Sequence, residues 1–280
     1  MDHSNGESKH PAFRMNWKGA VALLGGLLFV LFILSTINVA VLFSTGINLQ
    51  YQMWFNALMN IFPLLGAILA FDFFIVRRQT GKPLNFNFRL PNLMTLVFIF
   101  PMMIGMMFIA EFFTSLVPTD GPVFGEFYNR VSGIFKDMMK DPILMFIMLV
   151  ISAPILEEII FRGIIQKGLI NNGSSPKKAI FIAAIFFAVV HGNPWQFVGA
   201  ILLGSFLGYI YHVTKSLLVP ILLHAFNNGL SYVLMMGPKV ESFYECLGLE
   251  PWQVCALGLI IFGSFYYLFN KKYKVHYLDI

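Results

Sequence analysis

Residues 142–169 read PILMFIMLVISAPILEEIIFRGIIQKGL. As a helix that rises about 1.5 Å per residue, this stretch is long enough to cross the hydrocarbon core of a bilayer, which is about 30 Å thick. It also places two adjacent glutamates and an arginine far from either end. The stretch therefore predicts a membrane-spanning helix that carries a buried group of charges.

The whole chain shares this apolar character. Of its 280 residues, 58% are hydrophobic and 12% are charged, whereas about 25% of an ordinary soluble domain is charged. Too few polar side chains remain to cover a soluble protein, so lipid must cover much of the surface. The composition also excludes disordered and disulfide-rich proteins. The formal net charge of +5 does not indicate a nucleic-acid partner, because the placement of Lys and Arg matters more in a membrane protein than their sum.

Eight stretches are long and apolar enough to span a bilayer. They are 19–44, 52–76, 92–117, 142–169, 177–193, 195–213, 216–236 and 251–269. The predicted fold is an all-α membrane protein, a polytopic bundle of about eight transmembrane helices. The fifth and sixth spans meet at Gly192, Asn193 and Pro194, where we expect a tight turn. The first span is too long for the apolar part of a signal peptide, so we interpret it as a membrane anchor.

The basic residues are distributed unequally between the two sides of this bundle. Fourteen lysines and arginines fall on one side, from Lys9 near the N-terminus to Lys274 near the C-terminus, and four fall on the other. Because cytoplasmic loops carry the excess of Lys and Arg, both termini are predicted to be cytoplasmic. We expect a multi-pass integral membrane protein in the plasma membrane of a bacterium.

The outside segment between the third and fourth spans has apolar residues at helical spacing. They are Phe127, Val131, Ile134, Phe135 and Met138. This spacing predicts an amphipathic interfacial helix, which either packs on the bundle or gates the entry of substrate. The two cysteines, Cys246 and Cys255, are predicted to be free thiols, and a disulfide between them stays open if that face is oxidising.

Ionisable residues inside a membrane are costly, so each one needs a partner. Glu158 and Arg162 lie four residues apart on one helix face, where they can form an ion pair. Glu157 points about 100° away from Glu158, and it must find its partner on another helix. Pro154 removes a backbone donor one turn earlier and predicts a kink.

Two other spans supply candidates for that partner. His191 ends the fifth span, and His224 begins a polar face of the seventh. Asn228 shares that face, with Asn227 as an alternative. Counted at about 1.5 Å per residue from the inside ends, these residues lie at depths that overlap with the depth of Glu157. We therefore expect a carboxylate, two imidazoles and an amide to meet in one buried pocket.

A glutamate and two histidines suit two kinds of chemistry. They can activate water by general base catalysis, or they can hold zinc with one coordination position open. The zinc ligands would be Glu157, His191 and His224. Both arrangements favour hydrolysis. Between the two histidines, Ala200, Gly204 and Gly208 repeat every four residues, a spacing that allows close helix packing and carries no chemical information.

Four motifs occur in order within residues 142–236. They are Glu157-Glu158-x-x-x-Arg162, Phe187-x-x-x-His191, the stretch from Gly204 and Gly208 to Thr214-Lys215-Ser216-Leu217, and His224-x-x-x-Asn228. Together they resemble the CPBP family of CAAX proteases and bacteriocin-processing enzymes, which includes the Ras-converting CAAX endopeptidase and Abi-type proteins. A bundle of eight helices also suits this family. Lys215 departs from the family pattern, where glycine is expected, and this departure concerns substrate entry more than chemistry.

The resemblance implies hydrolysis of a peptide bond inside the membrane. It implies that Glu157 and His191 activate the water. His224 and Asn228 would stabilise the oxyanion. The supporting residues would be Glu158 and Arg162. The family is often labelled metalloprotease, so Zn²⁺ is one expectation, but the same residues also suit a metal-free glutamate mechanism, which we favour.

The substrate that the resemblance implies is a membrane-embedded, prenylated or leader peptide, and the lipid bilayer is the other expected partner. The sequence contains no His-Glu-x-x-His, Gly-x-Gly-Asp or Gly-x-Ser-x-Gly motif of other intramembrane proteases. Two alternatives stay open. One is a proton-coupled secondary transporter, since buried Glu and His also build proton relays. The other is a catalytically silent bacteriocin-immunity membrane protein.

On this interpretation the chain divides into four parts. Residues 1–18 form a cytoplasmic N-terminal tail, and residues 19–141 form the first three transmembrane helices and the outside amphipathic segment. Residues 142–236 form a catalytic core that resembles the CPBP family. Residues 237–280 form the last loop, the last transmembrane helix and a basic cytoplasmic tail.

Overall fold

Residues 12–273 are described by the computed structural model, and every regular element in this range is helical, which confirms the predicted all-α fold. The α-helices are α1 (Trp17–Thr45), α2 (Met53–Phe71), α3 (Arg77–Thr80), α4 (Leu93–Ser115), α5 (Gly121–Met138), α6 (Pro142–Phe146), α7 (Ala153–Glu158), α8 (Lys167–Asn171), α9 (Pro176–Val189), α10 (Pro194–Thr214), α11 (Leu218–Met236), α12 (Phe243–Leu247) and α13 (Pro251–Tyr273). The π-helical segments are η2 (Asp72–Val76), η3 (Ile147–Ser152) and η4 (Ile159–Gln166), and η1 (Leu49–Tyr51) is a short 3-10 helix. Lys9 and Lys274, which the predicted sidedness uses, lie outside the described residues.

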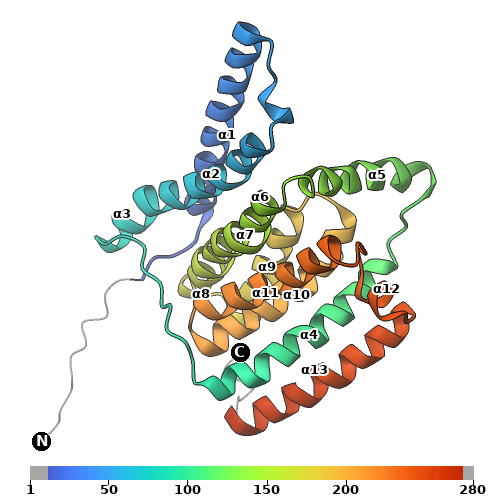
Figure 1. Cartoon of the computed structure of the whole chain (residues 1–280). Helices are drawn as coiled ribbons and strands as arrows, with labels where there is room; N and C mark the ends of the chain where they lie inside the picture. The colour runs from blue at the N-terminus through green and yellow to red at the C-terminus, as the bar shows by residue number, and fades with distance from the viewer. Residues whose placement is uncertain (1–11, 274–280) are drawn as a thin grey trace, which may run out of the picture.

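Seven helices in residues 12–273 are long and apolar enough to cross a membrane. They are Trp17–Thr45, Met53–Thr80, Leu93–Ser115, Pro142–Asn171, Pro194–Thr214, Leu218–Met236 and Pro251–Lys272. The remaining predicted span, 177–193, is α9, which packs beside α10 (Figure 1). α9 has 14 residues, which extend only about 21 Å. The chain is a multi-pass membrane protein, and its number of spans is close to the predicted eight.

Three helices of the bundle start with the same local signal. The side chains of Asp141, Ser175 and Asn193 accept a backbone hydrogen bond at the start of α6, α9 and α10. A proline directly follows each of these residues. The side chain satisfies a free N–H group, and proline fits the first turn because an N–H there would have no helical partner. Asn193 thus begins α10 directly after the tight turn that the sequence predicts.

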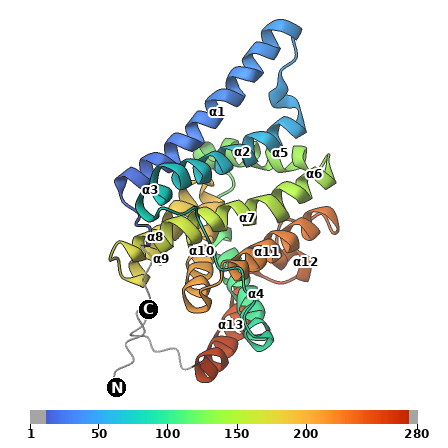
Figure 2. The same ribbon diagram turned by 90° about the vertical axis from the view of Figure 1, so that its left-hand side faces the viewer.

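The centre of the bundle is α10, which contributes to both clusters of buried apolar side chains. One cluster joins α1, α2, η4 and α9 and includes Ala200 of α10. The other joins α4, α11 and α13 and includes Leu207 of α10. α4 and α13 lie side by side, whereas the hairpin of α1 and α2 projects from the other helices (Figure 1 and Figure 2).

The predicted amphipathic helix is confirmed as α5, which lies across one end of the bundle (Figure 1). The rings of Phe127 and Tyr128 pack on Trp195, with centroid distances of 5.5 and 5.1 Å. The indole N–H of Trp195 also donates to the carbonyl of Pro118 at 3.2 Å. Trp195 belongs to the first turn of α10, so α5 is fixed next to the turn that carries His191.

Close contact between α4 and α13 depends on a glycine in each helix. A β-carbon on Gly258 would lie 2.7 Å from the carbonyl oxygen of Gly105, and one on Gly105 would lie 2.7 Å from the backbone nitrogen of Phe262. Backbone atoms cannot move aside as the end of a flexible side chain can. The two helices therefore keep this distance only with glycine at both positions.

Gly258→Ala should destabilise the chain, because its β-carbon would push α13 away from α4. Overpacking of this kind costs about 1–3 kcal/mol. Gly263→Ala on the same helix is the matched control, since nothing lies within 4 Å of a β-carbon there, and alanine favours the helix. Thermal unfolding in detergent measures both variants. Equal midpoints for the two variants would contradict the close contact.

Candidate active site

The helix from 142 to 171 carries the charged residues of the candidate site. It joins α6, η3, α7, η4 and α8 without a break. At the end of η3, the N–H of Ala153 donates to the carbonyl of Met148, five residues earlier. Pro154 follows directly, so the helix accommodates its proline by a local change of hydrogen-bond register. The two adjacent glutamates thus lie between two π-helical segments.

Glu158 and Arg162 form the predicted ion pair. Nη1 of Arg162 lies 2.5 Å from Oε1 of Glu158, and the two side chains are only 1% and 0% exposed. Nη2 of Arg162 donates to the carbonyl of Gly204 on α10 at 3.0 Å. The guanidinium also lies over the ring of Phe187 on α9, 4.7 Å from its centroid, a favourable cation–π contact. Arg162 thereby connects three helices.

His224 on α11 completes this group and supplies the partner that Glu157 requires. Nδ1 of His224 lies 2.8 Å from Oε1 of Glu158, the same oxygen that Arg162 contacts. A carboxylate paired with arginine only accepts, so Nδ1 carries the hydrogen. Nε2 of His224 lies 3.8 Å from Oε2 of Glu157. The predicted contact of Glu157 with a neighbouring helix is therefore present.

His191 is oriented by the main chain. Its Nδ1 lies 2.7 Å from the carbonyl oxygen of Phe187, one turn earlier. Because a carbonyl only accepts, Nδ1 carries the hydrogen, and Nε2 of the neutral ring keeps a free electron pair. The ring of Phe187 contacts His191 and His224 edge-on, with centroid distances of 4.9 and 5.5 Å.

Asn228 lies one turn after His224 and is held through both ends of its amide group. Its Nδ2 donates to the carbonyl of Leu149 in η3 at 2.9 Å. Its Oδ1 accepts a hydrogen bond from Nδ2 of Asn227, also at 2.9 Å. An amide nitrogen has two hydrogens, so one N–H remains for a ligand. Asn227, the predicted alternative, instead orients Asn228.

The predicted zinc ligands can be compared with this arrangement. Within residues 12–273, no three His, Cys, Asp or Glu side chains form a group that could hold a metal ion. Nδ1 of His224 is bound to Glu158, and the carboxylate of Glu157 faces Nε2 of His224 at ion-pair distance. His191 thus does not join Glu157 and His224 in a group of three ligands, and we derive no chemical step through a metal.

Gln166 continues the row of polar side chains on the long helix, and it was not predicted from the sequence. This buried residue donates from Nε2 to the carbonyl of Gly208 at 2.9 Å, one turn beyond the bond between Arg162 and Gly204. A β-carbon on Gly208 would lie 2.8 Å from Oε1 of Gln166. The glycines of α10 therefore expose carbonyls to side chains in addition to allowing close packing. The signal was the interval of four residues from Glu158 to Arg162 and from there to Gln166.

Lys215 lies outside this polar group and ends α10. Its φ is 54°, a left-handed conformation in which glycine alone has no steric penalty. Its N–H donates to the carbonyl of Tyr211 at 2.8 Å, which caps the helix. Partial burial lowers the pKa of its ammonium group. The left-handed cap is a physical reason for the glycine that the motif analysis expects here.

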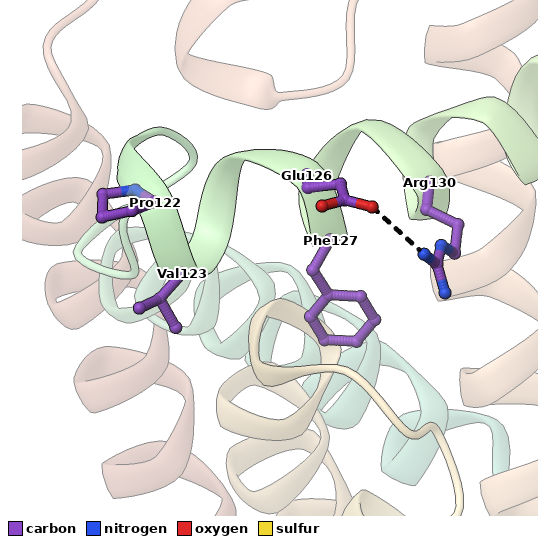
Figure 3. A pocket seen from close by; sticks show the side chains of 5 residues that line it. All are labelled: Pro122, Val123, Glu126, Phe127 and Arg130. Carbon is purple, nitrogen blue, oxygen red and sulfur yellow. Dashed lines mark hydrogen bonds and ion pairs between the residues drawn. The ribbon is translucent and has the colours of Figure 1, made fainter.

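A pocket on the surface of α5 is separate from the buried polar residues. Its lining consists of Pro122, Val123, Glu126, Phe127 and Arg130 (Figure 3). Glu126 and Arg130 form an exposed ion pair at 3.4 Å. The lining comes from one helix and contains none of the predicted site residues. The candidate site is therefore not this pocket but the place where the buried polar side chains around Glu157 meet.

Comparisons with known proteins concern the part of the chain that carries this site. Residues 139–230 match the family model described as Type II CAAX prenyl endopeptidase Rce1-like. UPF0177 protein YaiF of Lactococcus lactis subsp. lactis (strain IL1403) is 31% identical over 146 residues, which cover 49% of this chain and 63% of that protein. The protein named Putative membrane peptidase YdiL, of Bacillus subtilis (strain 168), is 31% identical over 129 residues, which cover 46% of this chain and 50% of that protein. The chain thus spans less than two thirds of either relative. No solved structure matches the chain.

Arg162→Ala should reduce the yield of folded protein, because Glu158 would stay charged and keep only the hydrogen bond from His224. Breaking a buried pair costs about 3–5 kcal/mol. Adding Glu158→Gln should partly restore folding, since it removes the buried charge. Gel filtration and thermal unfolding in detergent measure this, with Arg130→Ala as the control that breaks only an exposed pair. Additive losses in the double variant would refute the pairing.

Proposed function

We propose that this chain is an intramembrane endopeptidase, because residues 139–230 match the family model described as Type II CAAX prenyl endopeptidase Rce1-like. Its reaction is the hydrolysis of a peptide bond in a membrane-associated peptide. The observation that carries the proposal is the carboxylate of Glu157, which makes no hydrogen bond to any described residue and lies 3.8 Å from Nε2 of His224. A carboxylate that is free to accept a proton suits general base catalysis.

In the first step, Glu157 takes a proton from water while the water oxygen attacks the peptide carbonyl carbon. The electron pair of the carbonyl double bond moves to its oxygen and gives a tetrahedral oxyanion. His191 orients the water, because its Nδ1 hydrogen is bound to Phe187 and its Nε2 is free to accept a hydrogen bond. The C–N bond then breaks, and the proton on Glu157 passes to the leaving amine. The carboxylate is thereby regenerated.

His224 and Asn228 stabilise the oxyanion in this proposal. As an imidazolium, His224 donates from Nδ1 to Glu158 and from Nε2 to the oxyanion, while the neighbouring carboxylates offset its positive charge. Asn228 donates through its second N–H, since the first is bound to Leu149. Each donor of this kind contributes about 3 kcal/mol to the stability of the transition state. Glu158 and Arg162 support the site by holding His224 in place.

The matching family and the membrane setting support a proposal for the substrate class. The description of the matching family names CAAX prenyl endopeptidases, and the name of the Bacillus relative includes a membrane peptidase. We propose a peptide that reaches the site from the bilayer, either with a prenyl group or as the leader of a membrane-associated precursor. Entry from the bilayer suits a site whose side chains come from the long helix of residues 142–171, from α11 and from the turn after α9.

Glu157→Gln should abolish cleavage and leave the fold intact, because it keeps the shape of the side chain and removes the base. The loss of a general base lowers the rate by about 10²- to 10⁴-fold. Comparative proteomics of membranes from cells with the intact protein and from cells with Glu157→Gln should reveal uncleaved substrates. Turnover of such a substrate is then measured with the purified proteins. Glu126→Gln on the exposed face of α5 is the control. Full turnover by purified Glu157→Gln would show that another group is the base.

Removal of metal ions should leave turnover unchanged, because the proposed chemistry uses only side chains. Asn228→Ala removes an oxyanion donor without touching a candidate zinc ligand, and it should lower turnover by about 10²- to 10³-fold. Metal analysis of the purified protein, before and after a strong chelator, accompanies the turnover assay. Stoichiometric zinc, together with turnover that the chelator removes and zinc restores, would overturn the metal-free mechanism.

A further inference from the structure

The carbonyl of Leu149 lacks its usual main-chain donor. In an α-helix the N–H of Ala153 would reach it, but this N–H donates to Met148. In the π register that follows, residue 154 would be the donor, and residue 154 is proline, which has no N–H. The register of η3 and the proline thus leave one carbonyl open inside a membrane helix.

The amide of Asn228 takes the place of the missing donor. Its Nδ2 lies 2.9 Å from the oxygen of Leu149. A carbonyl in the membrane interior has no water to bind, so leaving it without a partner is costly. Asn228 therefore satisfies the carbonyl of Leu149, and this carbonyl in turn fixes the Asn228 side chain.

We propose that Pro154 is a positioning residue for Asn228. By lacking an N–H, it presents the carbonyl of Leu149 as a fixed acceptor for the Asn228 amide. The catalytic part of this inference rests on the proposed function, in which Asn228 donates to the oxyanion.

The position of the amide plane follows from two hydrogen bonds. Asn228 donates to Leu149 and accepts from Asn227, so its planar amide group is held at both ends. The remaining N–H then has one direction. A donor fixed before substrate arrives needs no reorganisation during the reaction, and this preorganisation gives oxyanion sites their effect.

Pro154→Ala gives a combination of effects that a merely structural proline would not give. The new N–H can bond to the carbonyl of Leu149, and alanine favours the helix, so the melting temperature should stay equal or rise. The amide of Asn228 then loses its exclusive acceptor. The kcat should fall by about 10²-fold, with KM unchanged, since a small misplacement of a catalytic group has effects of this size. Pro101→Ala, at a proline inside α4, is the matched control and should keep the kcat.

A double-mutant cycle with Asn228→Ala tests the link on the full-length protein in detergent. Asn228→Ala should lower the melting temperature in the parent, where Leu149 loses its donor, and lower it less in the Pro154→Ala background. This readout needs no activity, so it stands even if no cleavage is found and the proposed function fails. Where cleavage is measurable, the double variant should be no slower than Asn228→Ala alone. Equal shifts of melting temperature in both backgrounds, or an unchanged kcat in Pro154→Ala, would overturn the inference.

Discussion

The buried ion pair between Glu158 and Arg162 is the constraint on which the other parts of the site depend. A charge in the membrane interior costs several kcal/mol or more unless it is paired and hydrogen-bonded. Three neighbouring helices meet this requirement. α10 supplies the carbonyl of Gly204, α11 supplies His224, and α9 places the ring of Phe187 on the guanidinium. The pair therefore determines which helices pack against the long helix and at which of its residues. As a result, Glu157 lies next to His224.

Main-chain carbonyls orient the polar side chains of this site. Arg162, His191 and Asn228 each bind a carbonyl on a helix, and each carbonyl is accessible for a different reason. The first belongs to a glycine without a β-carbon. The second lies in the last turn of α9, where the N–H of His191 donates to the carbonyl of Ala188 and not to that of Phe187. The third has no main-chain donor, because the π-helical hydrogen-bond register shifts the N–H of Ala153 to Met148 and the next residue is proline. The same contacts therefore satisfy backbone carbonyls and fix the side chains.

The sequence predicted what depends on spacing along one helix. It predicted the membrane spans, the pair of Glu158 and Arg162, and the need of Glu157 for a partner on another helix, because apolar length and the four-residue interval carry these signals. It did not predict that His191 binds a backbone carbonyl or that Gly208 receives Gln166. Every residue has the same backbone carbonyl, so the sequence does not indicate which carbonyl will accept a side-chain hydrogen bond. Whether a side chain can reach a given carbonyl depends on how the two helices are aligned. The glycine stripe was accordingly interpreted as packing alone. The span predicted at 177–193 was too long, because it included residues 190–193, which form the turn after α9.

The length of α9 has a consequence for the surrounding lipid. Large apolar side chains such as Phe181 and Phe186 are about half exposed on this helix, so it faces acyl chains. Its length of about 21 Å is well below the hydrocarbon thickness of about 30 Å, and a bilayer adapts to such a mismatch by becoming thinner nearby. The polar headgroup region is thereby drawn toward the turn that carries His191. In the proposed reaction, water would then have a short path into the protein, and a peptide that entered beside α9 would cross less hydrocarbon.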